Sequence, residues 1–155
     1  MSRVRSSAAR VSVTCSGRPG RDRNFAWRWF TDPSCRERFP RADWDHHATA
    51  HVNALRATAA RRAGDTDVDS LVRDLRGCSP EFERLWTVHE VAVRQFDHKR
   101  LIHPEVGLLH LTCEVLLTPT ADIRLLVFFP TEGTDARDKL DLLRVIGSQD
   151  LTTAR

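Results

Sequence analysis

Apolar residues recur every three to four positions through the first half of the chain, which predicts a series of amphipathic helices. We expect five of them, over residues 24–31, 33–39, 43–63, 65–77 and 79–90. Residues suited to the first turn of a helix stand at several of the predicted starts, such as Ser79 followed by Pro80. The first half of the chain is therefore predicted to be helical.

After Glu90 the pattern changes to the alternation that is typical of strands. Two short strands are expected over residues 92–96 and 100–103, joined by a turn at residues 97–99. A longer strand follows over residues 107–117. One face of that strand is apolar and consists of Leu109, Leu111, Cys113, Val115 and Leu117.

The last part of the chain predicts one more strand and a closing helix. Residues 119–122 are expected to turn, and residues 123–129 are apolar on both sides, which predicts a strand in the middle of the sheet with cover on both faces. A helix begins after Thr134 or Asp135 and presents its apolar residues to the core, namely Leu140, Leu143 and Ile146. This order predicts an α+β domain in which N-terminal helices pack on an antiparallel sheet and a C-terminal helix closes the fold.

Composition limits the class of protein. The chain has 155 residues, of which 41% are hydrophobic and 29% charged, as expected for one soluble globular domain with a real core. No window approaches the roughly 20 apolar residues of a membrane span, and the N-terminus lacks the apolar run of a signal peptide, so we expect a cytoplasmic protein. The four cysteines have no C-x-x-C spacing, which favours reduced thiols.

Positive charge is concentrated at the start of the chain. Residues 1–28 contain seven arginines and a single acidic residue, Asp22, whereas the rest of the chain has more acidic than basic residues. Because this Ser/Arg/Gly-rich segment has few apolar residues, we expect residues 1–23 to form a disordered basic tail and residues 24–150 to form one domain. The tail is either an arm that binds nucleic acid or a non-native extension of the coding sequence.

Candidates for metal binding and catalysis are weak. His46, His47 and His51 include an i, i+4 pair that could bind zinc, but no further ligand stands at a suitable spacing, so an exposed helix flank is the alternative and no metal is expected. Cys113 and His103 could form a nucleophile pair, yet nothing near Cys113 would lower its pKa, which favours a packed thiol. With no G-x-S-x-G turn and no glycine-rich phosphate loop, we expect neither an enzyme nor a cofactor.

Several short motifs follow one another in the order known from one protein family. They are Asn24-Phe25, Phe30-Thr31-Asp32-Pro33, Trp86 with His89, Lys99-Arg100 and His103-Pro104-Glu105-Val106-Gly107. Each motif alone is common, but together they resemble the ligand-binding domain of MmyB-like transcription regulators, which are bacterial helix-turn-helix proteins of the XRE type. The resemblance extends to the closing helix near Leu143.

This resemblance implies a PAS-like domain with an apolar pocket for a small hydrophobic effector, such as a fatty acid, placed after a DNA-binding domain. A DNA-binding domain of this kind needs several short helices and roughly 55 to 70 residues, which residues 1–23 cannot supply. We therefore expect a sensor that reaches DNA only through a helix-turn-helix domain absent from this chain. A truncated protein, a stand-alone sensor and a coding sequence that starts further upstream are the alternatives.

Strand alternation, together with the apolar face of the helix that contains Trp86 and His89, predicts which side chains line the effector pocket. Leu111 with Cys113, and Leu126 with Phe128, alternate onto one face of their strands. The predicted walls are Trp86, Phe96, Leu111, Cys113, Leu126 and Phe128, and the predicted polar contacts are His89, Arg100 and His103. Arg100 would pair with an acidic head group. A core histidine at position 89 and a solvated arginine at position 100 are the alternatives.

A protein–protein interaction module is the rival from a different class. In that case the apolar faces are simply core, and a helical face pairs with another regulator or with a second copy of the chain as a homodimer. A cavity between the side chains predicted to line the pocket would favour the effector-sensing function over the interaction module.

Overall fold

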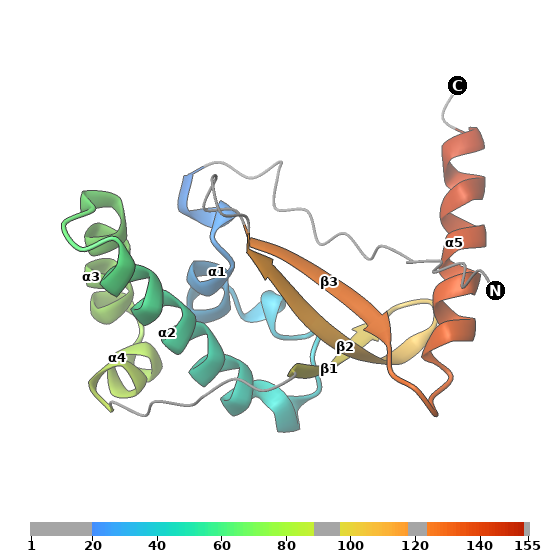
Figure 1. The fold of residues 1–155 in the computed structure, drawn as a ribbon, viewed down its shortest axis with the longest axis horizontal. Helices are drawn as coiled ribbons and strands as arrows, with labels where there is room; N and C mark the ends of the chain where they lie inside the picture. The colour runs from blue at the N-terminus through green and yellow to red at the C-terminus, as the bar shows by residue number, and fades with distance from the viewer. Residues whose placement is uncertain (1–19, 89–96, 118–123, 154–155) are drawn as a thin grey trace, which may run out of the picture. The chain divides into compact units, whose positions relative to one another are not determined.

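The computed structural model describes residues 20–88, 97–117 and 124–153. The chain divides into two compact units. Residues 20–88 belong to a helical unit, and residues 97–117 and 124–153 belong to a unit of strands and one helix (Figure 1). Each unit is described separately.

The helical unit contains four α-helices and three short 3₁₀ turns in its described part. The α-helices are α1 (Phe25–Thr31), α2 (Trp44–Arg61), α3 (Thr66–Cys78) and α4 (Pro80–Thr87), and the 3₁₀ turns are η1 (Gly20–Arg23), η2 (Pro33–Cys35) and η3 (Arg41–Asp43). Helix α4 ends two residues short of His89. The expected helix over residues 33–39 is wrong, because only the three residues after Asp32 adopt a helical turn.

Local capping explains why three of these helices begin where they do. The Asn24 side chain accepts a hydrogen bond from the Trp27 amide at α1, and the Asp65 side chain accepts from the amides of Asp67 and Val68 at α3. At α4 the Ser79 hydroxyl accepts from the Phe82 amide at 3.2 Å, with Pro80 in the first helical position. These side chains satisfy amides that have no partner inside the helix.

The core of the helical unit is aromatic and aliphatic. Trp29 from α1, Leu75 from α3 and Phe82 from α4 are fully buried, together with Val52 from α2. The Phe30 and Phe82 rings meet edge to face with centroids 5.1 Å apart, which is a favoured aromatic geometry. Each helix therefore contributes its predicted apolar stripe to a single core.

The predicted free tail is wrong at its last residues. Arg21 in η1 forms an ion pair with Asp74 at 2.7 Å and donates a hydrogen bond to the Ser70 hydroxyl at 2.7 Å. The folded part therefore begins before residue 24. Residues 1–19 lie outside the described residues.

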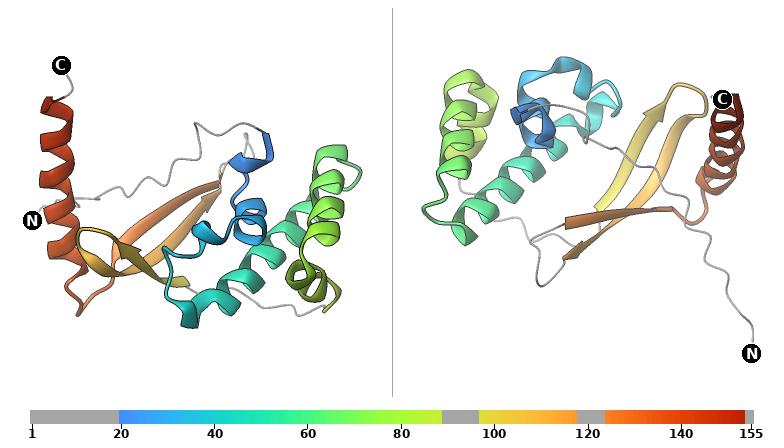
Figure 2. Two further views of the ribbon diagram at one scale, coloured as in Figure 1. Left: turned by 180° about the vertical axis from the view of Figure 1, so that it is seen from behind. Right: turned by 90° about the horizontal axis from the view of Figure 1, so that it is seen from above.

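The second unit contains a three-stranded antiparallel sheet in the order β1-β2-β3 and one helix. Its elements are β1 (Asp97–His103), β2 (Gly107–Leu117), β3 (Arg124–Pro130) and α5 (Ala136–Thr153). Figures 1 and 2 show α5 beside the end of the sheet that holds the β1–β2 turn. At that end Leu140 and Leu143 pack against Leu109 and Leu111.

The α+β class is confirmed, with helices first, an antiparallel sheet second and a helix last. Two predictions about the sheet are wrong. Residues 97–99 belong to β1 and pair with β2, so they form no turn. In the described sheet β2 is central and β3 pairs with it alone, and the side chain of Leu126 on β3 is 50% exposed. Residues 92–96 and 119–122 lie outside the described residues. None of the described helices has the length and apolar character that a membrane span requires.

Candidate ligand-binding site

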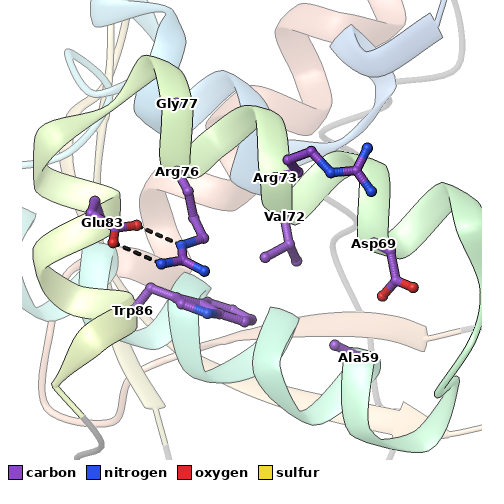
Figure 3. Close-up of a pocket in the computed structure, with 8 residues that line it drawn as sticks. All are labelled: Ala59, Asp69, Val72, Arg73, Arg76, Gly77, Glu83 and Trp86. Atoms are coloured by element: carbon purple, nitrogen blue, oxygen red, sulfur yellow. Dashed lines mark hydrogen bonds and ion pairs between the residues drawn. The ribbon is translucent and has the colours of Figure 1, made fainter.

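Helices α2, α3 and α4 border an open, shallow pocket of about 510 Å³ (Figure 3). Its lining residues are Ala59 from α2, Asp69, Val72, Arg73, Arg76 and Gly77 from α3, and Glu83 and Trp86 from α4. Of the residues predicted for the effector pocket, only Trp86 lines this one.

Trp86 is held in the pocket by contacts on its own helix and on α2. It stands one turn after Phe82, and the two rings stack with centroids 5.4 Å apart. The Arg56 guanidinium lies 5.2 Å from the centroid of the Trp86 ring. Arg56 also donates hydrogen bonds to the carbonyl oxygens of Leu85 at 3.2 Å, Trp86 at 2.9 Å and Val88 at 3.4 Å. Arg56 therefore caps the C-terminus of α4 and fixes the indole.

Charged side chains border the apolar floor of this pocket. Arg76 donates two hydrogen bonds to the Glu83 carboxylate, at 2.6 and 2.9 Å (Figure 3). The hydrogen bond from Arg76 lowers the pKa of Glu83 below its ordinary value, and the same bond raises the pKa of Arg76. Because each charge is matched by the other, this pair offers a ligand little net charge. Arg73 and Asp69 line the pocket further along α3.

The register of the sheet decides which of the other predicted residues share a face. Cys113 pairs with Phe128 across β2 and β3, and Leu126 precedes Phe128 by two residues. Leu111, Cys113, Leu126 and Phe128 therefore lie on one face, because alternate residues of a strand point to the same side. Leu111 and Cys113 are buried there, whereas Leu126 is half-exposed.

Of the predicted polar contacts, Arg100 lies on the opposite face of the sheet, and His103 lies at the far end of the apolar face. Arg100 pairs with His110, one position out of step with Leu111, so Arg100 lies on the opposite face of the sheet. His103 pairs with Gly107, six residues before Cys113 on β2. Six residues of strand span about 20 Å, so His103 is too far from Cys113 for a nucleophile–base pair. His89 and Phe96 lie outside the described residues.

One residue that the sequence interpretation did not select lies on the apolar face. Lys99 pairs with Leu111 and is only 8% exposed. Its strand was expected to begin at residue 100, which placed Lys99 in a turn. A pattern search over residues 97–103 as one strand would have put Lys99 on the same face as Leu101. The charged residues of α3 at the helical pocket were missed as well, because they alternate with its apolar stripe like ordinary surface residues.

Of the three histidines of α2, His46 lies on an exposed flank, whereas His47 and His51 pack against the core of the helical unit. The His47 side chain is buried, with its ring centroid 4.5 Å from that of Phe39 and 5.4 Å from that of Trp29. The His51 ring lies 5.2 Å from Trp29. Within the described residues, no three histidine, cysteine, aspartate or glutamate side chains are grouped so that they could hold one metal ion.

Comparison with known proteins gives one family. Residues 6–143 match the family model described as MmyB-like transcription regulator ligand binding domain. The match covers most of the chain and extends into both units. No curated protein matches the chain.

Proposed function

The chain belongs to the family of MmyB-like transcription regulator ligand-binding domains, and on that premise we propose that it senses a small hydrophobic or amphipathic effector, such as a fatty acid. In this proposal it has no catalytic activity. Its output goes to DNA through a helix-turn-helix domain outside this chain.

One observation supports an apolar ligand more than any other. The face of the sheet that contains Leu111, Cys113 and Phe128 continues to Leu126, whose side chain is 50% exposed. Helix α5 packs at the other end of this face, against Leu109 and Leu111. Covering exposed apolar surface contributes about 25 cal/mol per Å², so a chain-like ligand gains free energy by lying along this face toward Leu126.

Sensing requires only that the effector binds two conformations of this domain with different affinities. An effector that binds one conformation of the domain more tightly shifts the population toward that conformation, by no more than its differential affinity. A DNA-binding domain linked to the chain would read the change.

Thermal unfolding with a series of saturated acids of increasing chain length tests the proposal. At a hundredfold excess over Kd a ligand stabilises the native state by about 2.7 kcal/mol. For a chain of this size the melting temperature then rises by roughly 5 to 10 °C. We expect the rise to grow with chain length, because each added methylene buries more apolar surface.

The chain offers a matched pair of variants for the apolar face. Leu126 and Leu116 are 50% and 52% exposed, and their positions in the register place them on opposite faces of the sheet. Leu126→Asp should abolish the ligand-induced rise in melting temperature, and Leu116→Asp should leave it intact. Equal losses in both variants, or no rise with any acid in the wild-type protein, would contradict the proposal.

A protein–protein contact is the second candidate, and α5 supports it. Leu142 and Val145 stand one turn apart on α5 and are 51% and 52% exposed. An apolar pair of this kind would suit a homodimer or a partner regulator. Sedimentation velocity of the wild-type protein and of Leu142→Asp tests this candidate: a dimer that the substitution dissociates supports it, and a wild-type monomer at all concentrations argues against a homodimer.

A further inference from the structure

Strand β3 forms one border of the described sheet, and its sequence is unusual for an edge strand (Figure 1). The seven residues Arg124–Pro130 read RLLVFFP, with five apolar residues between an arginine and a proline. Proteins protect edge strands with charged side chains, because the open N–H and C=O groups of an edge pair readily with another strand. The opposite edge, β1, has this protection, since it reads DHKRLIH. Strand β3 therefore has the character of a strand that pairs on both sides.

The hydrogen bonds of the sheet determine which groups of β3 point away from β2. Just beyond the strand, the Thr131 amide donates to the His110 carbonyl oxygen at 3.0 Å, and these two residues continue the register of β2 and β3. Directly opposed residues alternate between bonded and non-bonded pairs along an antiparallel ladder. Odd-numbered residues of β3 therefore bond to β2, and even-numbered residues direct their backbone groups outward. Pro130 is an outward residue, so its missing N–H removes no hydrogen bond from the sheet.

The outward groups of β3 are complementary to those of a second copy of the same strand. Antiparallel pairing about Val127 aligns the whole strand with its copy, because Arg124 then lies opposite Pro130 and Leu126 lies opposite Phe128. The amides of Arg124, Leu126 and Phe128 then donate to carbonyl oxygens of the other copy, three from each copy and six in all. That number is within the range found at protein interfaces, about 10 ± 5.

The side chains near the centre of this pairing are also complementary. Leu126 is 50% exposed in one copy, and the Phe128 ring of the other copy would cover it. On the opposite face Val127 meets its own copy. Apolar cross-strand pairs, above all those with an aromatic ring, stabilise a sheet. Because the apolar run contains no charged residue, no like charges meet there.

We propose that β3 pairs with β3 of a second copy about a two-fold axis at Val127, so that two three-stranded sheets join into one antiparallel sheet. This inference requires no effector. It uses a different surface from Leu142 and Val145 on α5, which support the second candidate above. A two-fold dimer would present two linked DNA-binding domains in the symmetry of a palindromic operator.

Sedimentation velocity of the full chain tests the edge with two proline variants. Leu126→Pro removes an outward N–H of β3 and leaves the ladder to β2 intact. Ile102→Pro is the matched control, because Ile102 is 44% exposed on β1 and its N–H points outward by the same alternation. We expect Leu126→Pro to raise the dissociation constant of the dimer at least about tenfold, because each copy loses one intermolecular hydrogen bond. Ile102→Pro and Leu142→Asp should leave that constant unchanged.

A cysteine at the two-fold axis tests the register. The two copies of residue 127 form a non-bonded pair with Cα atoms about 4.5 Å apart, so Val127→Cys should form an intermolecular disulfide under mild oxidation. Leu126→Cys should not, because its two copies are two positions out of register and more than about 7 Å apart. The wild-type protein, with its own four cysteines, is the reference for cross-linking at other sites.

Several results would overturn the inference. One is a wild-type protein that is monomeric at all concentrations, as expected if another segment of the chain pairs with β3. A dimer that Leu142→Asp dissociates and Leu126→Pro does not would place the interface on α5, and equal weakening by both proline variants would also refute the edge contact. If Leu126→Pro does not fold, the cysteine variants still decide, because equal cross-linking in both variants and the wild type excludes the register. Each of these results leaves effector binding, and so the proposed function, untouched.

Discussion

Arg56 links α2 to the end of α4, and its removal provides a strong test of how the helical unit is held together. Its Nη2 group donates to three carbonyl oxygens at the C-terminus of α4, those of Leu85, Trp86 and Val88. Its Nη1 group donates to the Asn53 side chain at 2.8 Å, which orients the guanidinium. Arg56→Ala leaves the last carbonyls of α4 without this donor and exposes one face of an indole.

The cost can be worked out from these contacts. The shortest carbonyl bond, to Trp86 at 2.9 Å, is a hydrogen bond from a charged donor, and such bonds contribute about 1.5 to 3 kcal/mol. The contact with the Trp86 ring adds about 0.5 to 1 kcal/mol. Because Arg56 is partly exposed and water can replace some of its bonds, we expect a loss of about 2 kcal/mol in the free energy of unfolding.

Urea unfolding of the whole chain, followed by tryptophan fluorescence, measures this loss. Arg61→Ala is the matched control, because Arg61 is on the same helix, is exposed, and donates to the Thr58 hydroxyl at 3.3 Å. The control should cost less than about 0.5 kcal/mol, as surface substitutions usually do. If Arg56→Ala costs no more than Arg61→Ala, the capping and stacking roles assigned to Arg56 are incorrect.

Three further results are expected. Ser79→Ala should lower the free energy of unfolding by about 1 kcal/mol in the same assay, because the Phe82 amide loses its cap, and a change within error would exclude that role. Since the pKa of Glu83 lies below its ordinary value of 4.5, its pair with Arg76 adds stability at neutral pH that is lost as the pH falls from 4.5 through the lower value of the folded state. Glu83→Gln should flatten that acid limb of a stability–pH profile, and an unchanged limb would contradict this. Leu111→Ala should cost about 2 to 5 kcal/mol and Leu126→Ala much less, because only the first leaves a cavity in a packed core, so similar costs would refute the burial difference.

The helices of the first unit could be predicted well because their signals are local. Ser79 caps α4 as expected, and Asn24 and Asp65 cap α1 and α3 at the predicted starts of those helices. A cap needs only the two or three residues that follow it. The helix expected over residues 33–39 is a single turn, because a local start signal at Asp32 is not followed by an apolar stripe that packs and extends it. The end of α4 was missed because its C-terminus depends on Arg56, which is 30 positions away from Trp86 in the sequence.

The strands could be predicted in kind but not in register. Alternation correctly assigned Leu109, Leu111 and Cys113 to one buried face of β2. It could not show that residues 97–99 extend β1, because this depends on pairing with residues 111–113. The position of β3 in the sheet was mispredicted for a similar reason. An apolar run does not reveal how many neighbouring strands a strand has.

The candidate site shows most clearly what a register error does to a functional prediction. Lys99 and Arg100 are adjacent basic residues in one motif, and composition alone gives no reason to choose between them. Pairing of β1 with β2 places Lys99 opposite Leu111 and Arg100 opposite His110. A slip of one residue would exchange their faces, because side chains alternate along a strand. The register of β1 against β2 therefore decides which of the two cations lies on the apolar face.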